Sequence, residues 1–260
     1  MRKTSLLLFL VLFLSVSVSF FGCTAPPGPG PAPNPPSDIA PPPGGEQTAY
    51  PKEVTAALET LKPMQVALAI PVDGKTYLIV SYGEKPTAGY KAEITGIDRQ
   101  GDRLIVKSAL AEPKPGDAVA LVITHPNAVA AVDGVFKKVS FQDAAGGEFP
   151  QVVGLKSTLN SVRRSENSNI IVSSFASSPG AVDVAGIARV FEATVSYELQ
   201  NEAGQILAQG FVMAAAGGPH WGYFELNLNQ VPPEAAKLLL FQPSAKDGSK
   251  LDVVELELDR

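Results

Sequence analysis

The sequence predicts a mainly β protein, in which a small β-rich module is followed by a two-sheet β-sandwich. Apolar and polar residues alternate with a period of two over 191–200, 224–229 and 254–259, which is typical of strands with one wet face. Elsewhere, short apolar runs are separated by turn signals such as Asp73-Gly74, as expected of hairpins.

The composition suits a chain that folds around a core. Of the 260 residues, 45% are hydrophobic and 18% are charged, so global disorder is not expected. The net charge is -5, and it falls to about -7 if Arg2 and Lys3 are removed with a leader. An acidic protein lacks the positively charged surface that binds nucleic acid or an anionic lipid surface. The single cysteine, Cys23, excludes an internal disulfide and a multi-cysteine metal site.

Residues 1–22 have the pattern of a lipoprotein signal peptide. Arg2 and Lys3 are followed by an apolar run over 5–21, and Phe20-Phe21-Gly22-Cys23 resembles a bacterial lipobox, whose cysteine receives the lipid. The alternative is a retained signal anchor with a bystander cysteine, and both interpretations place the body beyond the membrane. We expect a protein of the cell membrane, lipid-anchored through Cys23 and lying on the extracytoplasmic face.

Residues 23–50 are expected to form a lipidated, proline-rich tether. Ten prolines lie within 25–45, and this composition favours an extended polyproline conformation. At roughly 3.1 Å per residue, the segment would reach on the order of 80 Å. It would therefore lift the body away from the membrane.

The first module is expected over 51–141. A helix is predicted at 51–61, because Val54, Leu58 and Leu61 fall on one face. The apolar run 118–124 is expected to be a central strand that is buried on both faces. Further strands are predicted over 65–70, 75–81, 88–98, 103–110 and 135–141.

Four short motifs follow one another in this module: Pro86-Thr87-Ala88-Gly89-Tyr90, Leu104-Ile105-Val106, Pro115-Gly116-Asp117 and Val122-Ile123-Thr124-His125-Pro126. Together they resemble the C-terminal domain of the protease complex subunit PrcB, over about 75–135. The resemblance implies an accessory module that binds or stabilises a partner protein without catalysis. Thr87, Gly89 and Tyr90 are the candidate binding residues here. The alternative is that Gly89 supplies an unusual backbone angle and Tyr90 is a core residue.

Residues 142–167 are expected to be an inter-domain linker, because they contain Gly146-Gly147, Pro150 and a polar run; a short helix is predicted near 155–162. From 168 to 260 the pattern is all β, with about seven short strands. That spacing favours a two-sheet sandwich.

The second module carries Val184-Ala185-Gly186, Phe191-Glu192-Ala193-Thr194-Val195 and Gly222-Tyr223-Phe224 in that order. These motifs resemble the immunoglobulin-like domain of bacterial spore-germination proteins, over nearly all of 168–260. The resemblance implies an immunoglobulin-like β-sandwich with an extracytoplasmic binding or scaffolding role. It brings no catalytic residues.

Catalytic and metal-binding motifs are not found in the sequence. It has no Gly-x-Ser-x-Gly elbow, no phosphate-binding loop and no zinc-ligand spacing, so we expect no enzyme activity, metal or cofactor. Trp221 and Tyr223 belong to an aromatic cluster at 219–223 and are further candidate binding residues. The alternative interpretation is that Trp221 is a core residue beside a turn.

These patterns predict a membrane-anchored, extracytoplasmic lipoprotein that is non-enzymatic. We expect it to bind or organise a protein partner, in a protease or a germination or envelope complex, with strand edges as contact surfaces. The alternative is a lipoprotein that binds cell-wall glycan or a small ligand. Nucleic acid is not an expected partner.

Overall fold

The computed structural model describes residues 50–259. The predicted signal peptide, Cys23 and the tether up to residue 49 lie outside this range. Among the described residues, no helix is long and apolar enough to cross a membrane. Two β modules make up this part of the chain, and they are mainly β, as the sequence predicts.

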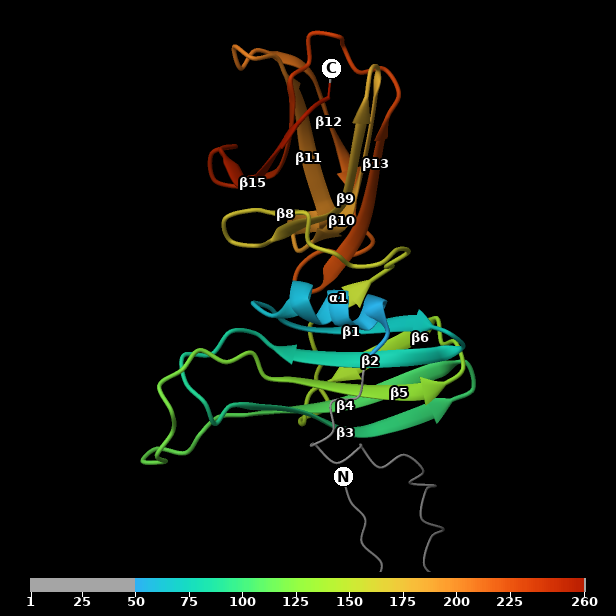
Figure 1. Cartoon of the computed structure of the whole chain (residues 1–260), viewed down its shortest axis with the longest axis vertical. Coiled ribbons are helices and arrows are strands. Elements are labelled where there is room, and N and C mark those ends of the chain that lie inside the picture. Colours follow the sequence, from blue (N-terminus) through green and yellow to red (C-terminus); the bar gives the residue numbers. More distant parts are fainter. Residues whose placement is uncertain (1–49, 260) are drawn as a thin grey trace, which may run out of the picture. The chain divides into compact units, whose positions relative to one another are not determined.

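The N-terminal module consists of one helix and two three-stranded sheets (Figure 1). Helix α1 spans Lys52–Leu61 and buries Val54, Ala57 and Leu61 on one face, close to the predicted pattern. The first sheet has the order β1-β2-β5, formed by β1 (Gln65–Val72), β2 (Lys75–Tyr82) and β5 (Asn127–Asp133). The second has the order β3-β4-β6, formed by β3 (Lys91–Gln100), β4 (Arg103–Ala111) and β6 (Lys138–Gln142).

The hairpin of β1 and β2 turns at the predicted dipeptide. Asp73 and Gly74 have φ angles of 50° and 77°, and Val72 pairs with Lys75 across the turn. Two successive positive φ angles are the mark of a type I′ turn, whose twist matches that of the strands. The local sequence therefore sets the register of this hairpin.

Strand β2 is buried on both faces. Leu78 and Val80 belong to a core that also contains Leu104, Val106 and Phe141 of the second sheet. Ile79 faces the opposite way and packs into a different core, with α1. The β1-β2-β5 sheet is thus an inner layer with apolar contacts on each side.

The prediction of a buried strand at 118–124 is wrong. Strand β5 pairs with β2 instead, joining Leu78 to Ala130 and Val80 to Ala128. The apolar run lies between Pro113, Pro115 and Pro126 in a loop, and prolines cannot donate to a strand ladder. Because β5 already occupies the place beside β2, the run stays outside the sheet.

The C-terminal module is a sandwich of two sheets, as expected of an immunoglobulin-like domain. One sheet has the order β7-β13-β10-β9-β8 and the other has the order β12-β11-β14-β15. Their inner faces enclose a core that includes Val172, Val184, Val195, Phe224 and Leu240. The strands are β7 (Val152–Val153), β8 (Arg163–Arg164), β9 (Ile170–Ser178), β10 (Ala181–Ala188), β11 (Thr194–Gln200), β12 (Ile206–Met213), β13 (Trp221–Leu228), β14 (Lys237–Pro243) and β15 (Lys250–Glu257).

Two details of the second module differ from the sequence-based expectation. The segment 142–167 contributes β7 and β8 to the five-stranded sheet, and it contains no helix at 155–162. Phe191 was expected to point inward at the start of an alternating strand, but it lies in a short 3-10 turn and is exposed. Glu192 and Ala193 have positive φ angles there, so the extended backbone begins only at Thr194.

A third apolar core joins residues of the two modules. Val54, Leu61 and Leu68 pack in one cluster with Ile187 and Trp221, which lie on the outer face of the five-stranded sheet. Arg164 of β8 donates from Nη2 to the carbonyl oxygen of Thr60 at 2.6 Å. Burial lowers the pKa of the Arg164 guanidinium. The five-stranded sheet is therefore covered by apolar contacts on both faces.

Candidate functional site

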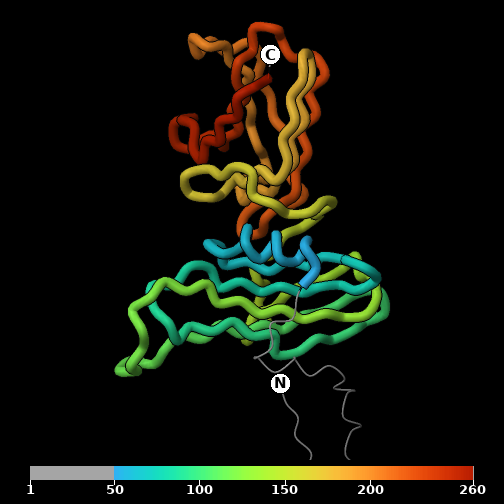
Figure 2. The backbone as a smooth tube through the Cα atoms, in the orientation of Figure 1, coloured from blue at the N-terminus to red at the C-terminus, as the bar shows by residue number. Residues whose placement is uncertain are grey.

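Two loops of the N-terminal module, 83–90 between β2 and β3 and 112–126 between β4 and β5, run side by side; we call them the loop pair (Figure 2). The backbone groups of Lys85 and Thr124 hydrogen-bond to each other in both directions, at 2.9 and 3.0 Å. The Ala88 amide donates to the Ala120 carbonyl at 3.0 Å. These bonds tie the two loops into one ordered unit, although neither is a regular strand.

Gly89 holds the loop pair close together. Its φ is +92°, which side chains rarely tolerate. A Cβ atom at this position would lie 2.9 Å from Cγ1 of Val119 and 3.0 Å from Cβ of Pro113. The position therefore requires glycine for two reasons, the backbone angle and the close approach of the opposite loop.

An aromatic pair and a lysine lie at the base of the loop pair. The rings of Tyr82 and Tyr90 meet edge to face, with centroids 5.7 Å apart. Nζ of Lys85 lies 3.7 Å from the Tyr82 centroid and 5.6 Å from that of Tyr90. The Tyr82 hydroxyl donates to Glu112 at 3.3 Å. Burial, and secondarily the charge of Glu112, raise the pKa of the Tyr82 phenol. Such cation–π and edge-to-face contacts favour one orientation of these side chains.

Three consecutive aliphatic side chains project from the loop pair; we call Leu121, Val122 and Ile123 the apolar apex. The Val122 amide donates to the Ala120 carbonyl at 3.0 Å, which places Leu121 at the tip of a three-residue turn. The Leu121 side chain is 89% exposed, and Val122 and Ile123 are each more than half exposed. Contiguous exposed apolar residues on an ordered loop are a signal of an interaction surface.

The two loops that carry the apolar apex also contain charged residues of both signs, such as Glu84, Lys85 and Lys114. Oε2 of Glu84 lies 3.5 Å from Nε2 of His125. The backbone amide of Lys114 donates to the Asp117 carboxylate at 2.8 Å. An apolar centre with a mixed polar rim is the usual anatomy of a protein–protein contact. The loop pair does not have the concentrated positive charge that binds an anionic lipid surface.

The first three predicted binding residues lie within the loop pair, but they support it rather than project from it. The carbonyl of Thr87 accepts a hydrogen bond from the Thr124 hydroxyl at 2.9 Å. Gly89 permits the close approach of the loops, and the half-buried Tyr90 packs against Tyr82. Sequence reasoning missed the apolar apex itself. The prolines on both sides of the apolar run could have indicated that it lies in a loop.

The other two predicted binding residues are not at the surface. Trp221 is 2% exposed and Tyr223 is 4% exposed, and both belong to the core that includes α1. The interpretation of 219–223 as an exposed binding loop is therefore wrong for these two rings, whereas the other interpretation, in which Trp221 is a core residue, fits. The Tyr223 hydroxyl donates to Glu225 at 3.0 Å and also lies 3.3 Å from the Ser157 hydroxyl. Burial raises the pKa of this phenol.

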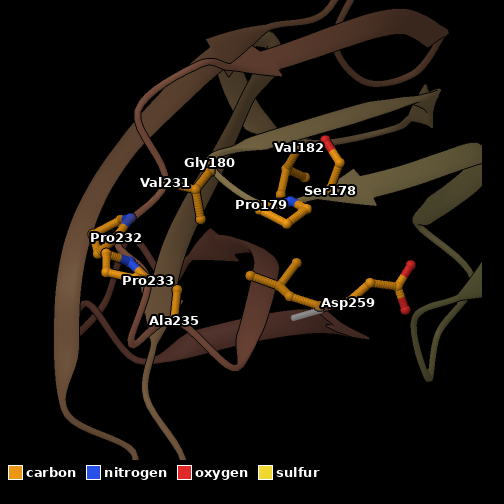
Figure 3. A pocket seen from close by; sticks show the side chains of 10 residues that line it. Ser178, Pro179, Gly180, Val182, Val231, Pro232, Pro233, Ala235 and Asp259 are labelled. Atoms are coloured by element: carbon orange, nitrogen blue, oxygen red, sulfur yellow. The ribbon is translucent and has the colours of Figure 1, made fainter.

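A small apolar pocket opens at one end of the sandwich (Figure 3). Its volume is about 300 Å³, and Pro179, Pro232 and Pro233 are among its lining residues. Ser178 and Asp259 supply polar groups at its border. Small-ligand sites normally combine apolar walls with several convergent polar groups. This pocket does not favour the alternative of a glycan binder, because its walls contain no aromatic ring. Within residues 50–259 there is no group of three or more side chains that could hold a metal ion.

Comparisons with known proteins identify two regions of the chain. Residues 173–249 match the family described as the immunoglobulin-like domain of bacterial spore germination, and residues 76–133 match the family described as PrcB C-terminal. Both matches fall on the segments that the sequence motifs indicated. The class defined by the fold and these matches is that of a two-module β protein, in which one module is similar to each of the two families.

The chain is also similar to an uncharacterized protein of Methanocaldococcus jannaschii. The two are 33% identical over 64 residues, which are 25% of this chain and 38% of the relative. The chain thus spans less than two fifths of that protein's length. No solved structure matches the chain.

Proposed function

We propose that this protein is a membrane-anchored, extracytoplasmic lipoprotein that acts as a non-enzymatic binding or scaffolding subunit for another exported protein. The observation that carries the proposal is the apolar apex, Leu121, Val122 and Ile123, held out on the ordered loop pair. The partner class is a protease or a component of a germination or envelope complex, in keeping with the two family matches. The proposal is non-enzymatic because neither resemblance carries catalytic residues.

The test is crosslinking in cells that produce the full-length protein, followed by affinity capture and mass spectrometry. We expect one dominant exported partner. Leu121→Asp should reduce its recovery about tenfold or more, because a charge in an apolar interface centre loses its solvation. The variant should not unfold, since Leu121 is almost fully exposed.

The matched control is Val162→Asp, which places the same charge at an exposed aliphatic residue outside the loop pair. This variant should keep the partner. If both variants retain it, the apolar apex is not the contact surface. If the parent protein captures no protein above background, the scaffold proposal fails, and binding to wall fractions becomes the better hypothesis.

The anchor has a separate test. Cys23 is the proposed lipid acceptor. Cys23→Ala should leave an unprocessed precursor that carries no labelled fatty acid. A normally processed, released product from this variant would rule out lipidation at Cys23.

A further inference from the structure

Strand β12 (Ile206–Met213) is an open edge of the four-stranded sheet. The sheet order is β12-β11-β14-β15, so β12 pairs with β11 on one side and with no other described strand on the other. An edge strand presents unpaired amide and carbonyl groups that can accept another strand. Soluble proteins usually protect such edges.

The edges of the sandwich differ in length and in charge. In the five-stranded sheet, the edge strands β7 and β8 are only two residues long, and each pairs with two residues of its neighbour, β13 or β9. The opposite edge of the four-stranded sheet, β15, contains Lys250, Asp252, Glu255 and Glu257. Strand β12 has the sequence ILAQGFVM, with no charged residue and no proline. Of the two edges of its sheet, it is therefore the one without a charge barrier.

The exposed face beside this edge is apolar. Phe211 is 66% exposed and Met213 is 55% exposed, and they lie opposite Ser196 and Thr194 of β11. Residues two apart on a strand share a face, so Phe211 and Met213 form one apolar strip along the edge. Neither side chain belongs to the sandwich core.

Gly210 leaves the backbone of the edge accessible at its middle. On the inner face, the ring of Tyr197 fills the space that a side chain at position 210 would occupy. A Cβ atom at Gly210 would lie 2.7 Å from the Tyr197 hydroxyl oxygen. An aromatic ring that covers an edge glycine keeps the strand ordered. The edge is thus ordered while its backbone is unobstructed.

We propose that β12 is a self-association surface, where a second copy of this chain adds its own β12 in antiparallel orientation. The absence of charge is the reason for choosing a second copy as the partner, because β12 meets no like-charge repulsion from an identical strand. Strand β15 paired with itself would instead place acidic residues side by side. A twofold axis near Gly210 places Phe211 of each copy opposite Gln209 of the other. The two Phe211 rings then lie on adjacent diagonal positions of one face.

The size of the contact predicts a weak dimer. With this axis, seven residues of each β12, 207–213, face one another and extend over about 24 Å, at about 3.4 Å per residue. Such a contact lies at the low end of specific interfaces, below about 1,200 Å² in total. Association should therefore depend on protein concentration, and attachment of all copies to one membrane would favour it.

The first test places a photo-crosslinking phenylalanine analogue at position 211 of the full-length chain in its own cell. We expect a crosslinked species of twice the chain mass that contains only this protein. The matched control carries the analogue at Leu251, an exposed residue of the charged edge β15, and should give no such dimer. A crosslink from position 211 to a different protein, or no crosslink at all, would overturn the proposal.

The second test asks whether two differently tagged copies are captured together. Phe211→Lys should lower co-capture about tenfold or more, because each dimer would bring two lysines to one edge. Leu251→Lys should leave it unchanged. Equal co-capture for both variants would also overturn the proposal. Leu121→Asp should leave co-capture intact, so that failure of self-association and failure of partner binding by the apolar apex can be told apart.

Discussion

At the scale of single residues, Gly89 shows how one backbone position determines the shape of a surface. Its positive φ and its lack of a Cβ atom, which would overlap Val119 and Pro113, allow the two loops to approach each other. Nζ of Lys85 lies over the ring of the buried Tyr82, and this cation–π contact helps to fix the base of the loop pair. The apolar apex is therefore presented on an ordered support.

Substitutions at Gly89 and at a control glycine separate the effect of the positive φ from the effect of the close approach of the opposite loop. Gly89→Ala should lower the free energy of unfolding of the loop pair by about 1–3 kcal/mol, because it adds backbone strain and a steric overlap. Gly116→Ala is the matched control, since Gly116 has a φ of +91° and a Cβ atom there would meet no other atom within 4 Å. Hydrogen exchange of the 83–90 amides measures the difference. Equal effects of the two variants would show that close packing at Gly89 contributes nothing.

At the scale of secondary-structure elements, neighbouring apolar segments have opposite environments. Strand β2 is covered on both faces, while the apolar run 118–123 is mostly exposed. Both are rich in aliphatic residues, so local hydrophobicity does not separate them. The difference is that β5 takes the place beside β2, and prolines keep the other run out of the sheet.

Hydrogen exchange should reveal this contrast directly. We expect amides of β2 (Lys75–Tyr82) to be among the slowest to exchange, because they are buried and paired on both sides with β1 and β5. Amides over 117–123 should exchange faster by several orders of magnitude, since most of them lack a strand partner. Mass spectrometry of peptic fragments resolves the two segments. Comparable protection of the two would indicate that the run forms a strand in solution.

At the scale of the whole molecule, the described body is held by three apolar cores rather than two. The third includes Leu61 and Leu68 from the N-terminal module together with Ile187 and Trp221 from the sandwich. The β1-β2-β5 sheet and the five-stranded sheet both contribute to this third core, and each is buried on both faces. The two modules should therefore unfold together, although each family match covers only one of them.

Trp221 tests the shared core. Trp221→Ala should lower the free energy of unfolding by about 3–5 kcal/mol, because it removes a large buried side chain and leaves a cavity. Calorimetry should show one transition for the parent chain, moved in the variant to a lower temperature as a whole. Phe191→Ala, at an exposed ring, is the control and should have little effect. Two transitions, of which only one moves, would contradict joint unfolding.

Elements with local signals could be predicted from the amino-acid sequence. Strand alternation, the Asp73-Gly74 turn and the apolar face of α1 depend on neighbours along the chain, and the structure contains all three. The family motifs likewise located the two modules. Which apolar surfaces are covered became clear only in the folded chain. Trp221 and residues 121–123 look alike as apolar sequence, but one packs against α1 and the others remain exposed, because burial depends on which distant strand or helix occupies the neighbouring place.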